Sequence, residues 1–326
     1  MMSANLKPAF VRLKFFILSV DLAYESTQPF TSVEDERLYR FHKLFAESYV
    51  TNLRNLEAPW KPVIASVLDA IIKKVGARRP SMDIAVQQEQ PLPPPALSAA
   101  STDADRTMTG SKHKGTVYPD VSVLRYLLAD PNFRTLSPNN MSHEAVDYLV
   151  CAELKRSVSR AHIRQGLKVS NKGHTALLAF LRGAARQAQR QAFVAMKRPD
   201  LANSDLILIA ASGPFWMWVL ASRASILKKF STTPMEDLLE EATAERNEDS
   251  TREEFNAIGF DDLENDDIDG SYTPISTALF NTISPGKVFK QDPGLPWSKV
   301  VMLDTRESEI ELQSIVKALI SVVEQK

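Results

Sequence analysis

The sequence predicts an α/β fold in which helices flank a central, mixed β-sheet. Apolar runs with strand-like spacing occupy residues 116–124, 145–155 and 206–211, and a long helix-forming stretch separates the last two runs. Amphipathic helical patterns lie near both ends of the chain. With 326 residues, of which 44% are hydrophobic, the chain is long enough to bury a sizeable core.

The composition argues against several classes of protein. Cys151 is the one cysteine, so the chain cannot form an internal disulfide or a zinc site built from several cysteines. The apolar patch within residues 7–20 is too short for a secretory signal, and no run approaches the roughly 18–20 apolar residues that span a bilayer. We therefore expect an intracellular protein, nuclear or cytoplasmic, without a membrane partner.

Residues 1–75 are expected to form an N-terminal strand and a helical layer. Helical spacing of apolar residues predicts a helix over 33–57, which Pro59 and Pro62 end, and a second helix over 63–75. The apolar stripe that should face the core in the first of these helices comprises Leu38, Phe41, Phe45, Tyr49 and Leu53.

A composition change after this layer predicts a disordered insertion over residues 76–113. This segment is rich in Gln, Pro, Ser, Thr and Ala and has few bulky apolar groups to offset the entropy lost on ordering. The main α/β core is then expected over 114–230. It contains the strands 116–124 and 145–155 and a basic helix over 173–197.

The core is predicted to end in a hairpin, in which strand 206–211 pairs with strand 215–220 across Ser212-Gly213-Pro214. An acidic loop over 231–271 follows. Residues 272–326 should complete the same domain with a strand at 299–303 and a helix at 307–323. The apolar face of that helix consists of Leu312, Ile315, Leu319 and Val322.

The net charge of −1 conceals a strong asymmetry along the chain. Residues 236–269 contain fifteen Asp and Glu but two Arg, whereas residues 111–230 contain eighteen Lys and Arg but seven Asp and Glu. This asymmetry indicates that the core faces a polyanion. The acidic segment is then either a solvated loop or an internal mimic of that polyanion.

Two acidic residues and a lysine form the strongest candidate for a chemical site. Alternation in strand 145–155 places Val150, Ala152 and Leu154 on one face and Cys151, Glu153 and Lys155 on the other. If strand 116–124 pairs beside it, Asp120 lies next to Glu153. Two carboxylates suffice to hold Mg²⁺, which prefers oxygen ligands and retains water.

These residues carry a resemblance to a known family. Pro119-Asp120 followed by Glu153-Leu154-Lys155, a long helix and a strand resembles the PD-(D/E)XK nuclease superfamily. The chain is particularly similar to fungal proteins with this domain, which share a Glu-x-Lys-Arg strand, an Ala/Gln-rich helix and the pattern seen here as Ala211-Ser212-Gly213-Pro214-Phe215-Trp216-Met217-Trp218.

The resemblance implies a restriction-endonuclease-like core and a nuclease that hydrolyses phosphodiester bonds with Mg²⁺, for which Mn²⁺ can substitute. It implies that Asp120 and Glu153 bind the metal ion and that Lys155 orients water or stabilises the transition state. Many members supply a further acidic residue from the first helix; Glu34 is the candidate there, but a glutamate in a first helical turn is commonly present for the helix dipole, so we do not assign it to the site. Gln187 and Gln191 are possible accessory residues.

Basic residues predict a surface that binds nucleic acid, either DNA or RNA. Arg182, Arg186 and Arg190 recur every four residues on the predicted helix, and Arg156 directly follows the Glu-x-Lys motif. Two alternatives stay open beside the nuclease. One is a catalytically inactive nucleic-acid-binding relative, and the other is a protein-interaction module whose basic core binds an acidic partner or the chain's own acidic segment.

Overall fold

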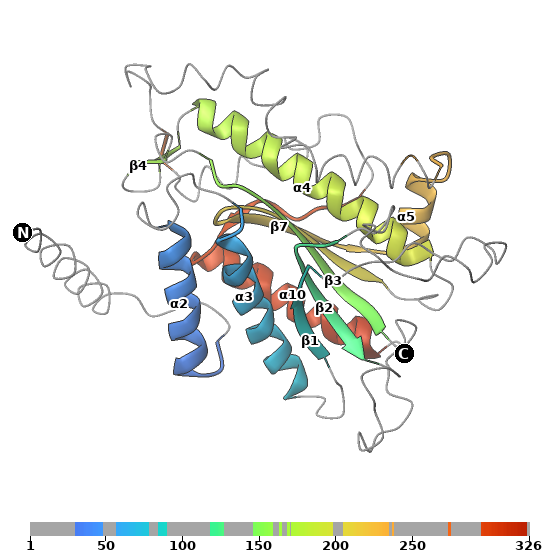
Figure 1. The fold of residues 1–326 in the computed structure, drawn as a ribbon, viewed down its shortest axis with the longest axis horizontal. Coiled ribbons are helices and arrows are strands. Elements are labelled where there is room, and N and C mark those ends of the chain that lie inside the picture. The colour runs from blue at the N-terminus through green and yellow to red at the C-terminus, as the bar shows by residue number, and fades with distance from the viewer. Residues whose placement is uncertain are drawn as a thin grey trace, which may run out of the picture.

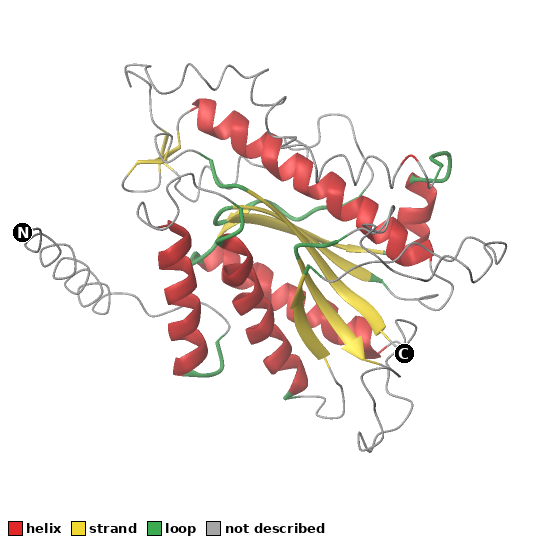
Figure 2. Cartoon of the chain, viewed as in Figure 1, coloured by secondary structure: helices red, strands yellow, loops and turns green. Residues whose placement is uncertain are grey.

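The structure is a computed structural model that describes residues 30–47, 57–77, 84–89, 118–126, 146–158, 163–164, 168–169, 171–197, 205–234, 237, 273–274 and 295–324. These residues form an α/β fold with a mixed six-stranded sheet flanked by helices (Figures 1 and 2). None of the described helices is both long and apolar enough to cross a membrane.

The strands of the main sheet follow the order β1-β2-β3-β6-β7-β9. Every neighbouring pair is antiparallel except β3 and β6, which are parallel and are connected through the helix α4 (Asn171–Lys197). The bounds are β1 Ile84–Gln88, β2 Val121–Tyr126, β3 Val146–Lys155, β6 Leu206–Ser212, β7 Phe215–Ala221 and β9 Val301–Met302. A separate three-stranded sheet consists of β4 Ile163–Arg164, β5 Lys168–Val169 and β8 Thr273–Pro274.

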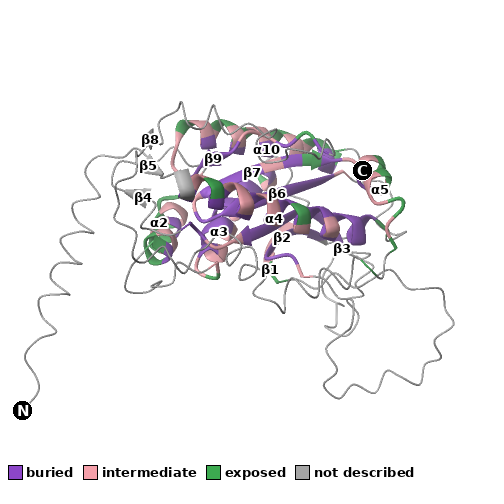
Figure 3. Cartoon of the chain, turned by 90° about the horizontal axis from the view of Figure 1, so that it is seen from above, coloured by how far each residue is buried: buried purple, intermediate pink, exposed green. Residues whose placement is uncertain are grey.

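Helices cover both faces of the main sheet. The helices α4 and α5 (Arg223–Lys229) pack together on one side, whereas α3 (Trp60–Gly76) and α10 (Arg306–Glu324) pack on the other (Figure 1), and the strands between them are largely buried (Figure 3). The helix α2 (Val33–Glu47) lies against α3. The sheet therefore separates two hydrophobic cores.

The central part of the sequence-based prediction is confirmed. In β3, Val150, Ala152 and Leu154 pack in the core beneath α3 and α10, whereas Cys151 packs in the core beneath α4, as the alternation predicted. The hairpin of β6 and β7 forms around Gly213 and Pro214. The predicted apolar face of α10 is buried as well, through Leu312, Ile315, Leu319 and Val322.

The predicted orientation of the first helix is wrong. Leu38 and Phe41 are 51% and 61% exposed, and α2 instead buries Tyr39 and Ala46. The Tyr39 hydroxyl donates a hydrogen bond of 2.9 Å to Asp304. This long-range contact turns the Tyr39 side inward, and an apolar stripe alone could not reveal it. Residues 48–56, the rest of the predicted helix, lie outside the described residues.

The two prolines before the second helix also act differently from the prediction. The helix α3 begins at Trp60, with Pro59 as its N-cap and Pro62 within its first turn. Proline is tolerated in the first turn because its missing N–H would have no intrahelical partner there. Pro62 therefore lies inside the helix rather than before it.

Part of the predicted disordered insertion is ordered. Residues 84–88 form the edge strand β1, which pairs antiparallel with β2 from Ile84 opposite Arg125 to Gln88 opposite Val121. Ile84 and Val86 pack against the core, and this short apolar alternation was hidden within a polar composition. Most of the insertion, the segment 7–20 and nearly all of the acidic loop lie outside the described residues.

The β6–β7 turn is tightly packed against the end of β3. Gly213 has a φ of 56°, and its N–H donates a hydrogen bond of 3.3 Å to the carbonyl of Lys155. A Cβ added at Gly213 would lie 2.4 Å from the Cβ of Ser157, which is closer than two such atoms can approach. A glycine is therefore required at this turn.

We predict that Gly213→Ala destabilises the protein by at least about 1–3 kcal/mol, because the left-handed backbone and the contact with Ser157 both oppose a side chain. Gly183→Ala is the matched control. Gly183 lies within α4, where its Cβ would make an ordinary 3.9 Å contact with the Lys155 side chain, and alanine favours a helix by roughly 0.5–1 kcal/mol over glycine. Urea denaturation of both variants tests this, and equal stabilities would contradict it.

Candidate active site

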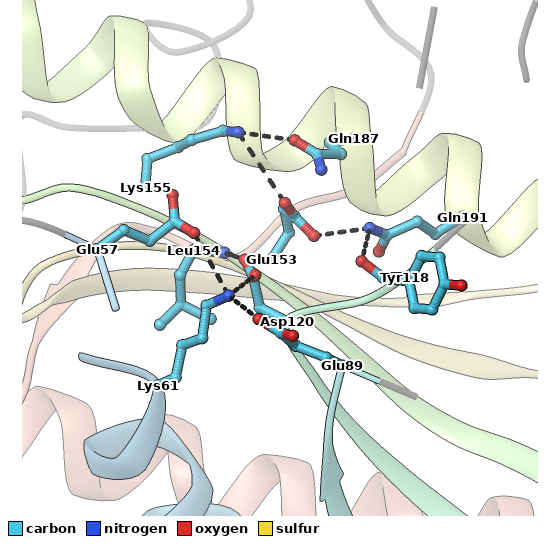
Figure 4. Close-up of polar contacts among 10 residues, drawn as sticks. All are labelled: Glu57, Lys61, Glu89, Tyr118, Asp120, Glu153, Leu154, Lys155, Gln187 and Gln191. Carbon is cyan, nitrogen blue, oxygen red and sulfur yellow. Dashed lines mark hydrogen bonds and ion pairs between the residues drawn. The ribbon is translucent and has the colours of Figure 1, made fainter. Parts of the chain in front are cut away.

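The candidate acidic residues meet where β2 begins and β3 ends. Asp120 immediately precedes β2, and Glu153 lies near the end of β3. One carboxylate oxygen of Asp120, Oδ2, accepts a hydrogen bond of 2.8 Å from the backbone N–H of Leu154 (Figure 4). This bond fixes the Asp120 side chain beside β3, so the predicted neighbourhood of Asp120 and Glu153 is present in the structure.

The long helix α4 supplies two glutamine side chains to the same place. Glu153 Oε2 accepts a hydrogen bond of 2.6 Å from Gln191, and the Lys155 ammonium donates one of 2.7 Å to Gln187 (Figure 4). The Lys155 Nζ lies 4.0 Å from Glu153 Oε1. The two glutamines are one helical turn apart, so a single row of α4 contacts both the acid and the lysine.

Three further charged residues complete the cluster, and the sequence analysis missed them. Lys61, in the first turn of α3, places its Nζ 2.7 Å from Asp120 Oδ1, 2.9 Å from Glu89 Oε1 and 3.8 Å from Glu57 Oε1. Glu57 precedes α3, and Glu89 follows β1. Asp120 is therefore contacted from the α3 side of the sheet, whereas Glu153 is contacted from α4.

A sequence signal for two of these residues did exist. Glu57 and Lys61 stand four residues apart at the start of an apolar helix, which is the spacing of an ion pair. A lysine in the first turn opposes the helix dipole, so it indicates nearby carboxylates. Glu57, rather than the exposed Glu34, is the acid of the helical layer whose charge acts on Glu153.

Glu89 holds an unusual backbone conformation at the edge of the site. Its φ is 52°, which is uncommon for a residue other than glycine and costs of order 1–3 kcal/mol. Its N–H donates a hydrogen bond of 3.1 Å to the carbonyl of Asp120. The same residue therefore contacts the Asp120 backbone and, through its carboxylate, the ammonium of Lys61.

Burial shapes the electrostatics of the site. Glu153 is 2% exposed, and this burial, followed by the negative charge of Asp120, raises the pKa of Glu153 well above its usual value. Burial and then Asp120 likewise raise the pKa of Glu57 to about 7. Burial lowers the pKa of Lys61, but the charge and hydrogen bond of Asp120, with Glu89 and Glu57, outweigh it and raise the pKa overall.

Three of the predicted basic residues lie on α4, the helix that supplies the two glutamines. Arg186 and Arg190 directly precede Gln187 and Gln191 in the chain, and Arg182 lies one turn before Arg186. Arg186 is exposed, and Arg182 and Arg190 are partly buried. Arg156 directs its guanidinium over the ring of Phe180, 5.5 Å from the ring centroid, so it packs against α4.

The donor atoms of the site fit Mg²⁺ in kind. Asp120 and Glu153 offer carboxylate oxygens, and the buried Oε1 of Gln191 has no hydrogen-bond partner among the described residues. Within the same part of the chain, no three His, Cys, Asp or Glu side chains are grouped so that they could hold a metal ion. The arrangement suits a cation that takes its remaining ligands from water or a phosphate rather than from a closed protein cage.

Comparisons with known proteins identify no relative, since no family model, no curated protein and no solved structure matches this chain. The functional interpretation therefore depends on the residues and geometry of the site.

The pKa of Glu57 gives a prediction for stability against pH. With a folded-state pKa of about 7 against an ordinary value of 4.5, the folded protein binds this proton more tightly than the unfolded chain does. The wild type therefore loses stability through Glu57 as the pH rises between these two values. We predict that the free energy of unfolding of Glu57→Gln, relative to that of wild type, increases as the pH rises from 4.5 to 8.

Urea denaturation in a metal chelator, at several pH values over this range, measures the difference between the two proteins. Glu34→Gln, at an exposed position of α2, is the control for the substitution itself. If the difference in the free energy of unfolding between Glu57→Gln and wild type stays constant with pH, the folded protein does not raise the pKa of Glu57.

Proposed function

We propose that this protein is an Mg²⁺-dependent phosphodiesterase that cleaves nucleic acid, with a PD-(D/E)XK-type site on a restriction-endonuclease-like core. One observation carries the proposal. Asp120, Glu153 and Lys155, predicted from a sequence motif, converge at one end of a mixed sheet, where α4 adds two glutamines. Phosphodiester hydrolysis needs carboxylates for a metal ion and a cation beside them.

Each residue has a defined task in this proposal. Asp120 and Glu153 would hold Mg²⁺, which when bound polarises a phosphoryl oxygen and promotes ionisation of water. Lys155, whose ammonium is directed by Gln187, orients the attacking water or offsets charge that develops on the phosphate. Gln191 fixes the carboxylate of Glu153 through its hydrogen bond.

The basic row of α4 favours nucleic acid as the substrate. Arg182, Arg186 and Arg190 lie on α4, each one position before the row that contains Gln187 and Gln191, and we expect a phosphate backbone that enters the site to contact them. Contacts of this kind supply affinity that depends on salt and carries no sequence information. The proposal therefore concerns the phosphodiester backbone that DNA and RNA share.

A second candidate is a binding module without catalysis on the same fold. Glu153 is almost completely buried, and its raised pKa favours the neutral acid, which is a poor metal ligand. The carboxylate of Asp120 is already neutralised by the ammonium of Lys61. Both features are expected if this protein binds nucleic acid but does not cleave it with a metal ion.

Cleavage of a mixture of single- and double-stranded DNA and RNA, with Mg²⁺ or Mn²⁺, tests the proposal. We predict metal-dependent cleavage that falls by about 100-fold or more in Asp120→Asn, Glu153→Gln and Lys155→Met, because each removes a group that the proposal assigns to the metal ion or to the phosphate. Lys73→Met is the matched control. Lys73, on α3, pairs with Asp35 of α2 and with Asp69 of its own helix, and neither carboxylate belongs to the site.

Nucleic-acid binding, measured at several salt concentrations, separates the outcomes. Salt-dependent binding by wild type without cleavage would favour the second candidate. If cleavage survives in all three site variants, it comes from a contaminant or from another site. If wild type neither cleaves nor binds nucleic acid, both candidate functions are contradicted.

A further inference from the structure

Among the residues that the structure describes, Lys61 forms the shortest ion pair with Asp120 or Glu153. Its ammonium lies 2.7 Å from Asp120 Oδ1, and its side chain is 14% exposed. It reaches the site from α3, on the opposite side of the sheet from α4 (Figure 4). Such a contact has no role in the sequence motif, so its effect on the site is a separate question.

The bonds of Asp120 show what Lys61 does there. Oδ2 of Asp120 accepts the backbone N–H of Leu154, which holds the start of β2 against β3. A metal ion that binds Asp120 through Oδ1, the oxygen that does not accept the Leu154 N–H, would meet the ammonium of Lys61 there. Two cations on one oxygen repel each other strongly at such short range, so the ammonium and a divalent ion compete for the same position.

The surroundings of Lys61 offer it a second position. Glu89 Oε1 and Glu57 Oε1 lie 2.9 and 3.8 Å from the same ammonium, and the Glu89 side chain is 54% exposed at the edge of the site. The lysine stem is flexible and carries three donors. The ammonium can therefore leave Asp120 and stay paired with these two glutamates.

We propose that Lys61 is an internal counter-ion of the metal site, which a divalent cation must displace from Asp120 before it binds. Lys61 then pairs with Glu89 and Glu57, which hold the released ammonium. This inference rests on the proposed function, because that function assigns Asp120 as a metal ligand. It adds a regulatory step, in which metal binding exchanges one cation for another and the resting affinity for metal is low.

Direct titration with Mn²⁺, without nucleic acid, tests the exchange. Free Mn²⁺ is followed by electron paramagnetic resonance for wild type, Lys61→Gln, Lys61→Met and the matched control Lys73→Met. The two Lys61 variants should bind Mn²⁺ about tenfold or more tightly than wild type, because the competing charge is gone, and Lys73→Met should bind as wild type does. An affinity in folded Lys61→Gln that is unchanged or weaker would overturn the proposal.

A second measurement needs no variant and so does not depend on its folding. Acetylation of wild-type lysines with acetic anhydride, read out by mass spectrometry, reports how accessible each ammonium is. Saturating Mn²⁺ should raise the labelling of Lys61 several-fold and leave that of Lys73 unchanged. Labelling of Lys61 that does not respond to Mn²⁺ would overturn the exchange.

These outcomes are distinguishable from failure of the proposed function. Tighter Mn²⁺ binding by the Lys61 variants, without cleavage by wild type, would support the exchange of Lys61 for metal and contradict the proposed nuclease function. Cleavage by wild type, with equal Mn²⁺ affinities of wild type and the Lys61 variants, would contradict the exchange but not the nuclease function. No Mn²⁺ binding by any variant would overturn the exchange and the metal assignment together.

Discussion

The carboxylate of Asp120 links the parts of this molecule that make up the site. One oxygen accepts the Leu154 N–H and ties β2 to the end of β3, and the other pairs with Lys61 and ties the sheet to α3. Glu153 and Lys155 depend on the same arrangement, because they project from the strand that Asp120 holds. The packing of the two helical layers on this sheet thus converts residues far apart in sequence into a single charged cluster.

The buried part of that cluster is held at a cost to stability. The pKa values of Glu153 and Glu57 are both raised, chiefly by burial, so each carboxyl group is less favourable as an anion here than in water. Lysine side chains on each side of the sheet offset part of this penalty. Strained or destabilised groups of this kind are concentrated at functional sites, and the positive φ of Glu89 beside Lys61 is a second instance.

Local patterns predicted the half of the site that lies on neighbouring strands and one helix. Alternation placed Glu153 and Lys155 together on one face of β3, and the family resemblance suggested Gln187 and Gln191, which contact these two residues from α4. Lys61 and Glu89 could not be placed, because their contacts depend on how α3 and the edge strand pack against the sheet. The predicted orientation of α2 was wrong for the same reason, since the hydrogen bond from Tyr39 to Asp304 joins distant parts of the chain.

The central claim is that the carboxylates of Asp120 and Glu153 form a divalent-cation site from which Lys61 must withdraw. A crystal structure of the protein with Mn²⁺, in which the metal is located by its anomalous scattering, tests it most directly. We expect a Mn²⁺ peak between these two carboxylates, with the Lys61 ammonium moved from Asp120 toward Glu89. A structure at saturating Mn²⁺ with no peak there, and with Lys61 still on Asp120, would contradict it.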